Sequence, residues 1–176
     1  MGSRKHILAI CGSTRNRSAN RDVIDAIARL SKDRLIITIY DGLSTLPYFN
    51  QDVTDADTPK EVVTFRKAIE QSDGVLICTP EYVFSLPGIL KNALEWTVST
   101  TVFSDKPTAL ITASSSGEKA HESLLLIMKT LGIKTHDDLC LWIPGVKSKL
   151  NTQGEITDVM LLDRLGKLIT GFDTIQ

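Results

Sequence analysis

The stretch KHILAICGSTRNRSANRDVIDAIARL, residues 5–30, decides the fold class of this chain of 176 residues. Its opening segment, 5–11, is almost continuously apolar from Ile7 onward, which is typical of a strand buried on both faces of a sheet. A polar loop follows, and the apolar residues of 20–30 then recur at the spacing of one helical face: Val23, Ile24, Ile27, Ala28 and Leu30. A buried strand, a loop and an amphipathic helix in this order indicate the first unit of an α/β domain.

The same alternation continues along the chain. Apolar segments predict further strands at 35–40, 74–79, 107–113 and 140–143. Segments of helical period predict helices from Thr58-Pro59 through Ile69, with proline at the first position, and at 87–98, 118–131 and 160–169. We therefore expect one domain spanning residues 1–176, with a doubly wound parallel sheet between two layers of helices. The ligand crevice of such a fold lies outside the carboxyl ends of the strands.

Composition excludes several other classes of protein. Hydrophobic residues make up 42% and charged residues 23%, which is ordinary for a globular protein and argues against disorder. The formal net charge of −1 gives no basic excess for nucleic-acid binding, and it argues against the acidic surface of an electron carrier. No apolar run approaches the roughly 20 residues that cross a bilayer. We expect partners that are small molecules, with neither nucleic acid nor a membrane.

The cysteines and the first residues bear on cellular location. Cys11, Cys78 and Cys140 are far apart and odd in number, and no Cys/His spacing indicates a metal site. We interpret them as buried reduced thiols. Residues 1–6 lead directly into the first strand without the apolar core of a signal peptide. Both observations predict a cytoplasmic protein.

The loop after the first predicted strand, GSTRNRSAN at 12–20, could hold a phosphate. Gly12 permits a tight turn, the loop's short side chains offer hydroxyl and amide donors, and Arg15 offers a guanidinium. The N–H groups at the start of the next helix add partial positive charge. The loop has neither the lysine of a Walker motif nor the glycine spacing of dinucleotide folds. A solvated turn in which Ser18 or Asn20 caps the helix remains the alternative.

Two further loops follow strands whose carboxyl ends lie at the same edge of the predicted sheet. The loop at 79–88 has two prolines and exposes apolar residues, so it could present backbone amides and an apolar edge to a planar ring. Alternatively, Tyr82, Phe84 and Leu86 pack over the end of the sheet or into a subunit interface. The small residues of ASSSG at 113–117 leave room for a ligand, or provide a serine cap for the next helix.

These segments resemble the NADPH-dependent FMN reductase family, which includes flavodoxin-like quinone, azo and chromate reductases. GSTRNRSAN at 12–20 is similar to the family's phosphate loop GSxRxxSxN. PEYVFSLPGILKNALEW at 80–96 is similar to its segment PEYNxSxPGxLKNxxDW, which is long and specific. The resemblance covers residues 5–131. It implies a flavodoxin-like three-layer sandwich with strand order 2-1-3-4-5.

The resemblance also implies cofactors, partners and site residues. FMN is the implied bound cofactor, NADPH or NADH the electron donor, and a quinone, azo compound, metal oxyanion or free flavin the acceptor. The implied assembly is a homodimer or homotetramer, with the loop at 80–83 and its helix near the interface. The implied FMN-binding residues are Ser13, Arg15, Ser18, Ala19 and Asn20 around the phosphate, Pro80, Glu81, Tyr82 and Val83 along the ring, and Ser114, Ser115 and Gly117 at the ring edge.

The chain departs from the family pattern at two places. Val83 stands where the family usually has Asn, so a side-chain amide is lost while the backbone donors remain. After Gly117 the family often continues to Gly-Gly and Arg, whereas this chain has EKAHE at 118–122. The second departure leaves open whether the donor is NADPH or NADH. It also keeps open a flavin-free binding domain, and a flavodoxin-type electron carrier is a further alternative.

Several residues carry weaker signals. We assign no catalytic acid or base, because the flavin itself carries the redox chemistry. His121 could donate a proton to a reduced acceptor, or it could be a surface or interface histidine. Trp96 and Trp142 fit core or interface anchors better than residues stacked on a flavin. The acidic segment at 41–57 could be a lid or an oligomer contact.

Overall fold

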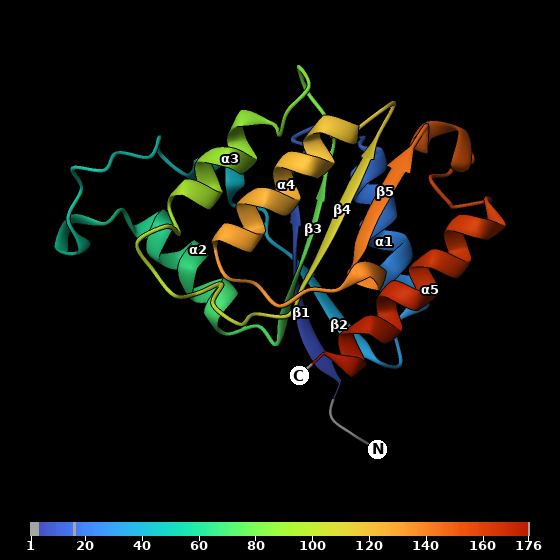
Figure 1. The fold of residues 1–176 in the computed structure, drawn as a ribbon, viewed down its shortest axis with the longest axis horizontal. Coiled ribbons are helices and arrows are strands. Elements are labelled where there is room, and N and C mark those ends of the chain that lie inside the picture. The colour runs from blue at the N-terminus through green and yellow to red at the C-terminus, as the bar shows by residue number, and fades with distance from the viewer. Residues whose placement is uncertain (1–3, 16, 176) are drawn as a thin grey trace.

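The computed structural model describes residues 4–15 and 17–175, so Asn16 of the first predicted loop lies outside the described residues. Within them, strands and helices alternate: β1 (Lys5–Cys11), α1 (Ala19–Leu30), β2 (Leu35–Ile39), α2 (Lys60–Glu70), β3 (Gly74–Thr79), α3 (Gly88–Glu95), β4 (Thr108–Ser114), α4 (Glu118–Thr130), β5 (Cys140–Pro144) and α5 (Val159–Thr174) (Figure 1). Every predicted strand and helix is present. The chain is therefore an α/β protein, as the sequence predicts.

The strands form one parallel sheet in the order β2-β1-β3-β4-β5. This confirms the predicted flavodoxin-like topology, in which β1 lies between β2 and β3. The register places Cys11 opposite Cys78, and Ser114 opposite Pro144. The loops that follow β1, β3, β4 and β5 therefore leave the sheet at the same edge.

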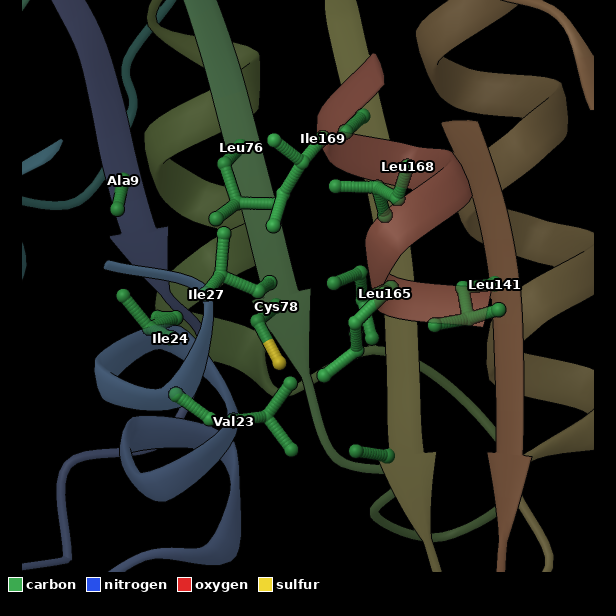
Figure 2. Close-up of a cluster of buried hydrophobic side chains, with 14 of the residues drawn as sticks. Ala9, Val23, Ile24, Ile27, Leu76, Cys78, Leu141, Leu165, Leu168 and Ile169 are labelled. Atoms are coloured by element: carbon green, nitrogen blue, oxygen red, sulfur yellow. The ribbon is translucent and has the colours of Figure 1, made fainter. Parts of the chain in front are cut away.

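Helices cover both faces of the sheet, because successive side chains of each strand point to opposite sides. On one face the strands pack against α1 and α5, and Figure 2 shows this cluster around Leu76 and Cys78. On the other face they pack against α2, α3 and α4, where Phe65 is completely buried. Each fully buried aliphatic or aromatic side chain of this kind contributes about 1.5–3 kcal/mol to stability. The two cores fix the sheet edge from which the loops extend.

The last helix, α5, packs against the strand that comes first in the chain. The Phe172 ring is buried beside Gly74 of β3, and the Lys5 ammonium donates a hydrogen bond to the Phe172 carbonyl oxygen. The predicted helix at 160–169 was too short, because the apolar spacing that buries Leu165 and Leu168 continues to Phe172. The helix therefore runs from Val159 to Thr174.

A few other details differ from the sequence-based expectations. Leu30 is 51% exposed, because it is the final residue of α1 and extends beyond its last buried turn. Pro59 precedes α2 as its cap residue instead of forming its first turn. Of the three thiols, Cys78 is buried as expected, but Cys11 and Cys140 lie at strand ends and are only half-buried. The helix α3 ends at Glu95, before the predicted residue 98, and gives way to a turn.

The acidic segment after β2 is fastened to α3. The Pro47 carbonyl oxygen accepts hydrogen bonds from the Asn92 side-chain amide at 3.0 Å and from the Trp96 indole N–H at 2.8 Å. The Phe49 N–H donates to the Asn92 side-chain oxygen, and its ring meets that of Trp96 edge to face at 5.2 Å. Trp96 is 2% exposed, which confirms it as a core anchor. Across the described residues, no helix has the length and apolar character required to span a bilayer.

Candidate functional site

A cavity of about 450 Å³ opens at the carboxyl edge of the sheet. Four segments far apart in the sequence line it, and they follow β1, β3, β4 and β5, whose arrowheads meet at this edge in Figure 1. The lining residues are Ser13, Arg15, Arg17, Ser18, Ala19, Asn20, Pro80, Glu81, Tyr82, Ala113, Ser114, Ser115, Gly145, Val146, Lys147 and Ser148. Ten of the twelve predicted site residues are among them. Val83 and Gly117 are not.

The first wall begins where β1 turns toward α1. A Cβ atom at Gly12 would lie 2.8 Å from the Thr79 Cβ and would also contact its hydroxyl, so the residue is required for close packing against β3. Its backbone does not adopt the left-handed conformation, so the predicted turn is not what requires glycine here. Ser18 then caps α1, its hydroxyl accepting from the Asn20 N–H at 3.3 Å. Ser18 is 7% exposed and also lines the cavity. The predicted cap at Ser18 is therefore present, and the same residue lines the cavity.

The Asn20 side chain is held by a contact with Cys78 of β3. Its side-chain oxygen accepts a hydrogen bond from the Cys78 thiol at 3.4 Å, and the residue is 4% exposed. Complete burial raises the pKa of Cys78 well above its usual value, which keeps the thiol protonated and able to donate. The amide of Asn20 therefore has a defined orientation at the base of the cavity.

The second wall is the short segment Pro80-Glu81-Tyr82, and a tight turn follows it. Tyr82 and Ser85 exchange two backbone hydrogen bonds of 3.0 Å, with Val83 and Phe84 between them at φ values of 51° and 56°. This left-handed conformation is unfavourable for a β-branched side chain and favours Asn or Gly. Val83 is 95% exposed and Phe84 77%, and neither lines the cavity. Leu86, by contrast, packs into the core.

The third wall, residues 113–115, continues into a loop that is held from three directions. The Gly145 N–H donates to the Ser115 carbonyl oxygen at 3.0 Å, and the Trp142 indole N–H donates to the Ser116 carbonyl oxygen at 2.7 Å. Gly117 has a φ of 88° and directly precedes α4. No serine caps this helix, because the Glu81 carboxylate accepts from its first N–H groups instead. Trp142, half-exposed at the edge strand, thus fastens a wall of the cavity.

The fourth wall, Gly145–Ser148, was missed from the sequence. It follows β5 and therefore lies at the carboxyl edge of the sheet, as do the loops after the first, third and fourth strands. Gly145 adopts a φ of 62° and leads into a short helical turn that exposes Lys147. The second arginine at the cavity, Arg17, was also not selected.

The charges that line the cavity favour an anion. Arg15, Arg17 and Lys147 contribute cations, and the cavity lies at the start of the twelve-residue helix α1, whose unpaired N–H groups add positive potential. The Glu81 carboxylate is occupied by the start of α4. Serine hydroxyls complete a donor set suited to phosphate, and the proline, alanine and valine side chains give the remaining walls apolar surface. Within 4–15 and 17–175, no cluster of His, Cys, Asp and Glu could hold a metal ion.

His121 lies behind the third wall, outside the cavity lining. Its Nδ1 lies 3.1 Å from the Thr112 hydroxyl, and the ring is half-buried. Burial, and secondarily the Arg164 guanidinium, lower the pKa of His121 below its usual value. Cys11 lies at the end of β1, where burial raises the pKa of its thiol. Both groups are therefore mainly uncharged at neutral pH.

Comparison with known proteins identifies relatives along most of the chain. The sequence model of NADPH-dependent FMN reductases matches residues 6–146. An NAD(P)H-dependent FMN reductase of Pseudomonas aeruginosa is 36% identical over 86% of this chain and 84% of its own length. An NAD(P)H:quinone oxidoreductase of Solanum tuberosum is 37% identical over 61% of this chain, and the match spans 57% of the plant protein.

A solved structure agrees with these sequence matches. The flavoenzyme NAD(P)H:(acceptor) oxidoreductase from Paracoccus denitrificans superposes with a TM-score of 0.84 at 26% identity, covering 97% of this chain and 98% of that protein. The family match includes the strands and the loops that line all but the last residues of the cavity. The chain therefore belongs to the NADPH-dependent FMN reductase family.

Proposed function

We propose that the cavity binds FMN and that the protein transfers electrons from a nicotinamide nucleotide through this FMN to a small acceptor. As a member of its family, the chain is an NAD(P)H-dependent oxidoreductase. One observation carries the assignment of the cavity. Cations and serine hydroxyls line the cavity beside the start of α1, and the segments at 80–82 and 113–115 form further walls.

The chemistry of the walls fits FMN. Its phosphate dianion suits the end formed by Ser13, Arg15, Ser18 and Asn20, because charge-assisted hydrogen bonds and the α1 terminus favour a negative group there. Lys147 from the fourth wall adds a further cation to the cavity lining. The volume of about 450 Å³ lies in the range of small-molecule sites, roughly 300–1,000 Å³. When bound, FMN supplies the hydride and electron chemistry of the reaction.

The chain's own residues bind and orient the cofactor. Arg15 neutralises phosphate charge, and Asn20, oriented by Cys78, presents its amide at the base of the site. Pro80 and Tyr82 line one side of the ring site, and Ser114 and Ser115 line its edge. Val83 lies on the exposed tip beyond the cavity and Gly117 lies behind it. We therefore propose that these two shape the loops without contacting the ring. No acid or base is required in this scheme.

Quinones are the proposed class of acceptor. The Solanum tuberosum relative carries this activity in its name, and a quinone is a flat molecule suited to an open, half-apolar cavity. NADPH and NADH remain alternative donors, because EKAHE at 118–122 differs from the family pattern.

We further propose a homodimer or homotetramer. An apolar groove of about 380 Å³ lies between α3 and α4, and beside it Leu126 is 70% exposed and Val98 62% exposed. Exposed apolar surface of this kind is typical of interfaces. The helix α3 follows the 80–83 loop, which the family resemblance places near the contact between subunits.

The first test is a visible absorption spectrum of the purified protein after incubation with FMN and desalting, repeated after addition of NADPH and then of NADH under nitrogen. Retained flavin bands that bleach with either nucleotide, and return on addition of a quinone, are the expected result. Retained bands that bleach with neither nucleotide would favour an electron carrier. A protein that retains no flavin at saturating FMN would contradict the proposal.

A further inference from the structure

The Glu81 carboxylate joins two walls of the cavity that are 36 residues apart in the sequence. Its Oε1 accepts from the Gly117 N–H at 3.3 Å, and its Oε2 accepts from the Ala120 N–H at 3.0 Å. Both donors lie at the start of α4, immediately after the third wall. The side chain therefore connects the segment at 80–82 to the loop at 114–117.

The helix α4 needs a partner of this kind, because it has no local cap. The first N–H groups of a helix lack partners within the helix, and its first turn favours negative charge. Gly117 stands at the cap position and has no side chain to accept from them. A Cβ there would lie 3.1 Å from the Thr112 methyl group and 3.3 Å from the Ser114 Cβ, and the φ of 88° would strain any side chain. Glu81 supplies the acceptor from another part of the chain.

The nearby cation Lys119 pairs with Glu122, so it does not compete with the α4 N–H groups for the Glu81 carboxylate. Lys119, in the first turn of α4, pairs with Glu122 at 2.9 Å. The rest of the 114–117 loop is held from the opposite side by Trp142 and Gly145. Glu81 thus fixes the side of the loop that faces the segment at 80–82, where those two hydrogen bonds do not act.

From this geometry we infer that Glu81 is a positioning residue for the flavin site: its carboxylate sets the distance between the 80–82 and 114–117 segments and is not itself a ligand of FMN. The inference rests on the proposed function. The family resemblance places Glu81 along the ring largely through its backbone, and the inference adds a separate role for its side chain. Each of the two Glu81 carboxylate oxygens accepts from a backbone N–H at the start of α4, so the carboxylate is directed toward that helix.

The test uses Glu81→Ala and Glu81→Gln, with Glu118→Ala as the matched control. Glu118 is an exposed carboxylate in the same first turn of α4 and has no contact with the 80–82 segment among the described hydrogen bonds. Hydrogen exchange of the Gly117 and Ala120 amides in the FMN-free protein measures the contact itself. The FMN dissociation constant and the visible circular dichroism of bound FMN measure its effect on the site.

We expect Glu81→Ala to exchange both amides at least tenfold faster and to weaken FMN binding about tenfold, equivalent to about 1.4 kcal/mol. Its flavin dichroism should change, because the walls shift around the ring. Glu81→Gln keeps one acceptor oxygen, so it should restore part of the affinity and also serves if the alanine variant folds poorly. Glu118→Ala should match the wild type in FMN affinity and in flavin dichroism.

The outcomes separate this inference from the proposed function. Wild-type protein that binds FMN, together with Glu81→Ala of unchanged affinity and dichroism, would overturn the inference alone. Faster amide exchange without any change at the flavin would reduce Glu81 to a structural cap and would overturn it as well. Wild-type protein that binds no FMN would overturn the proposed function, and this inference with it.

Discussion

Arg15 is the residue whose side-chain charge bears most directly on the proposed ligand. It lines the cavity beside Ser13, whose hydroxyl accepts from the Arg15 N–H at 3.4 Å. Arg15→Ala should weaken FMN binding by about 1–3 kcal/mol, because a charge-assisted hydrogen bond to phosphate is lost. Fluorescence quenching of FMN on titration with protein would measure this. Arg29→Ala, at the exposed far end of α1, should leave the affinity unchanged. Equal affinities of Arg15→Ala and the wild type would remove Arg15 from the site.

Val83 is strained, because its β-branched side chain disfavours the left-handed backbone conformation that it adopts. With φ at 51°, 95% exposure and no place in the cavity, it gains little burial to offset the left-handed strain. Asn tolerates this conformation, which gives a physical reason for the family's usual residue here. Val83→Asn should raise the free energy of unfolding by about 1 kcal/mol in urea titrations. Val159→Asn replaces another exposed valine where φ is negative, and should give no such gain. A Val83→Asn protein no more stable than the wild type would contradict the assignment of strain.

At the scale of a single helix, Ser18 combines two functions that substitution can separate. Ser18→Ala removes the α1 cap and should lower the free energy of unfolding by about 1 kcal/mol. Ser18→Gly should lower it by only a few tenths of a kcal/mol, because glycine is tolerated at a cap position. Both variants lack the hydroxyl that lines the cavity, so both should weaken FMN binding. Chemical denaturation and FMN titration of the pair would distinguish these effects. Full FMN affinity in Ser18→Gly would show that the hydroxyl serves only the helix.

His121 of α4 packs beside Thr112 of β4 and should make the free energy of unfolding depend on pH. Burial, and secondarily the Arg164 guanidinium, lower the pKa of His121 in the folded protein. Below pH 6.5, the ordinary pKa of histidine, this side chain therefore binds more protons in the unfolded chain than in the folded protein. Stability is therefore complete above about pH 6.5 and falls as the pH drops below it. His121→Asn keeps a polar partner for the Thr112 hydroxyl and cannot titrate. Urea midpoints at about pH 7, 6 and 5 should decline less steeply for this variant than for the wild type. Parallel declines would mean that His121 does not contribute.

At the scale of the whole molecule, the groove between α3 and α4 bears on assembly. Leu126→Glu places a charge on this groove and should shift the proposed oligomer toward monomer in sedimentation velocity experiments. Leu30→Glu changes a leucine of comparable exposure, 51%, at the end of α1 and should leave the assembly intact. If Leu126→Glu sediments as the wild type does, the interface must lie elsewhere.

The sequence predicts the framework of this molecule better than its details. Apolar periodicity is a local property, so it located every strand and helix of the sheet, and the loops at its carboxyl edge followed from their order. The Glu81 contact with α4 and the Gly12 contact with Thr79 join distant segments, and no local pattern records them. The wall at Gly145–Ser148 was missed because its residues resemble an ordinary turn. Its position at the cavity follows from β5 lying beside β4, which the predicted strand order already implies.

The packing of α5 on the first strand has a consequence for biosynthesis. The Lys5 side chain donates a hydrogen bond to the carbonyl oxygen of Phe172, which lies 167 residues later in the sequence. The ribosome therefore synthesises Lys5 well before its partner. At about 5–20 residues per second, roughly 10–30 s separate the two. During that interval α5 is not available to cover its part of the sheet, so this core can be completed only after the last helix has been synthesised.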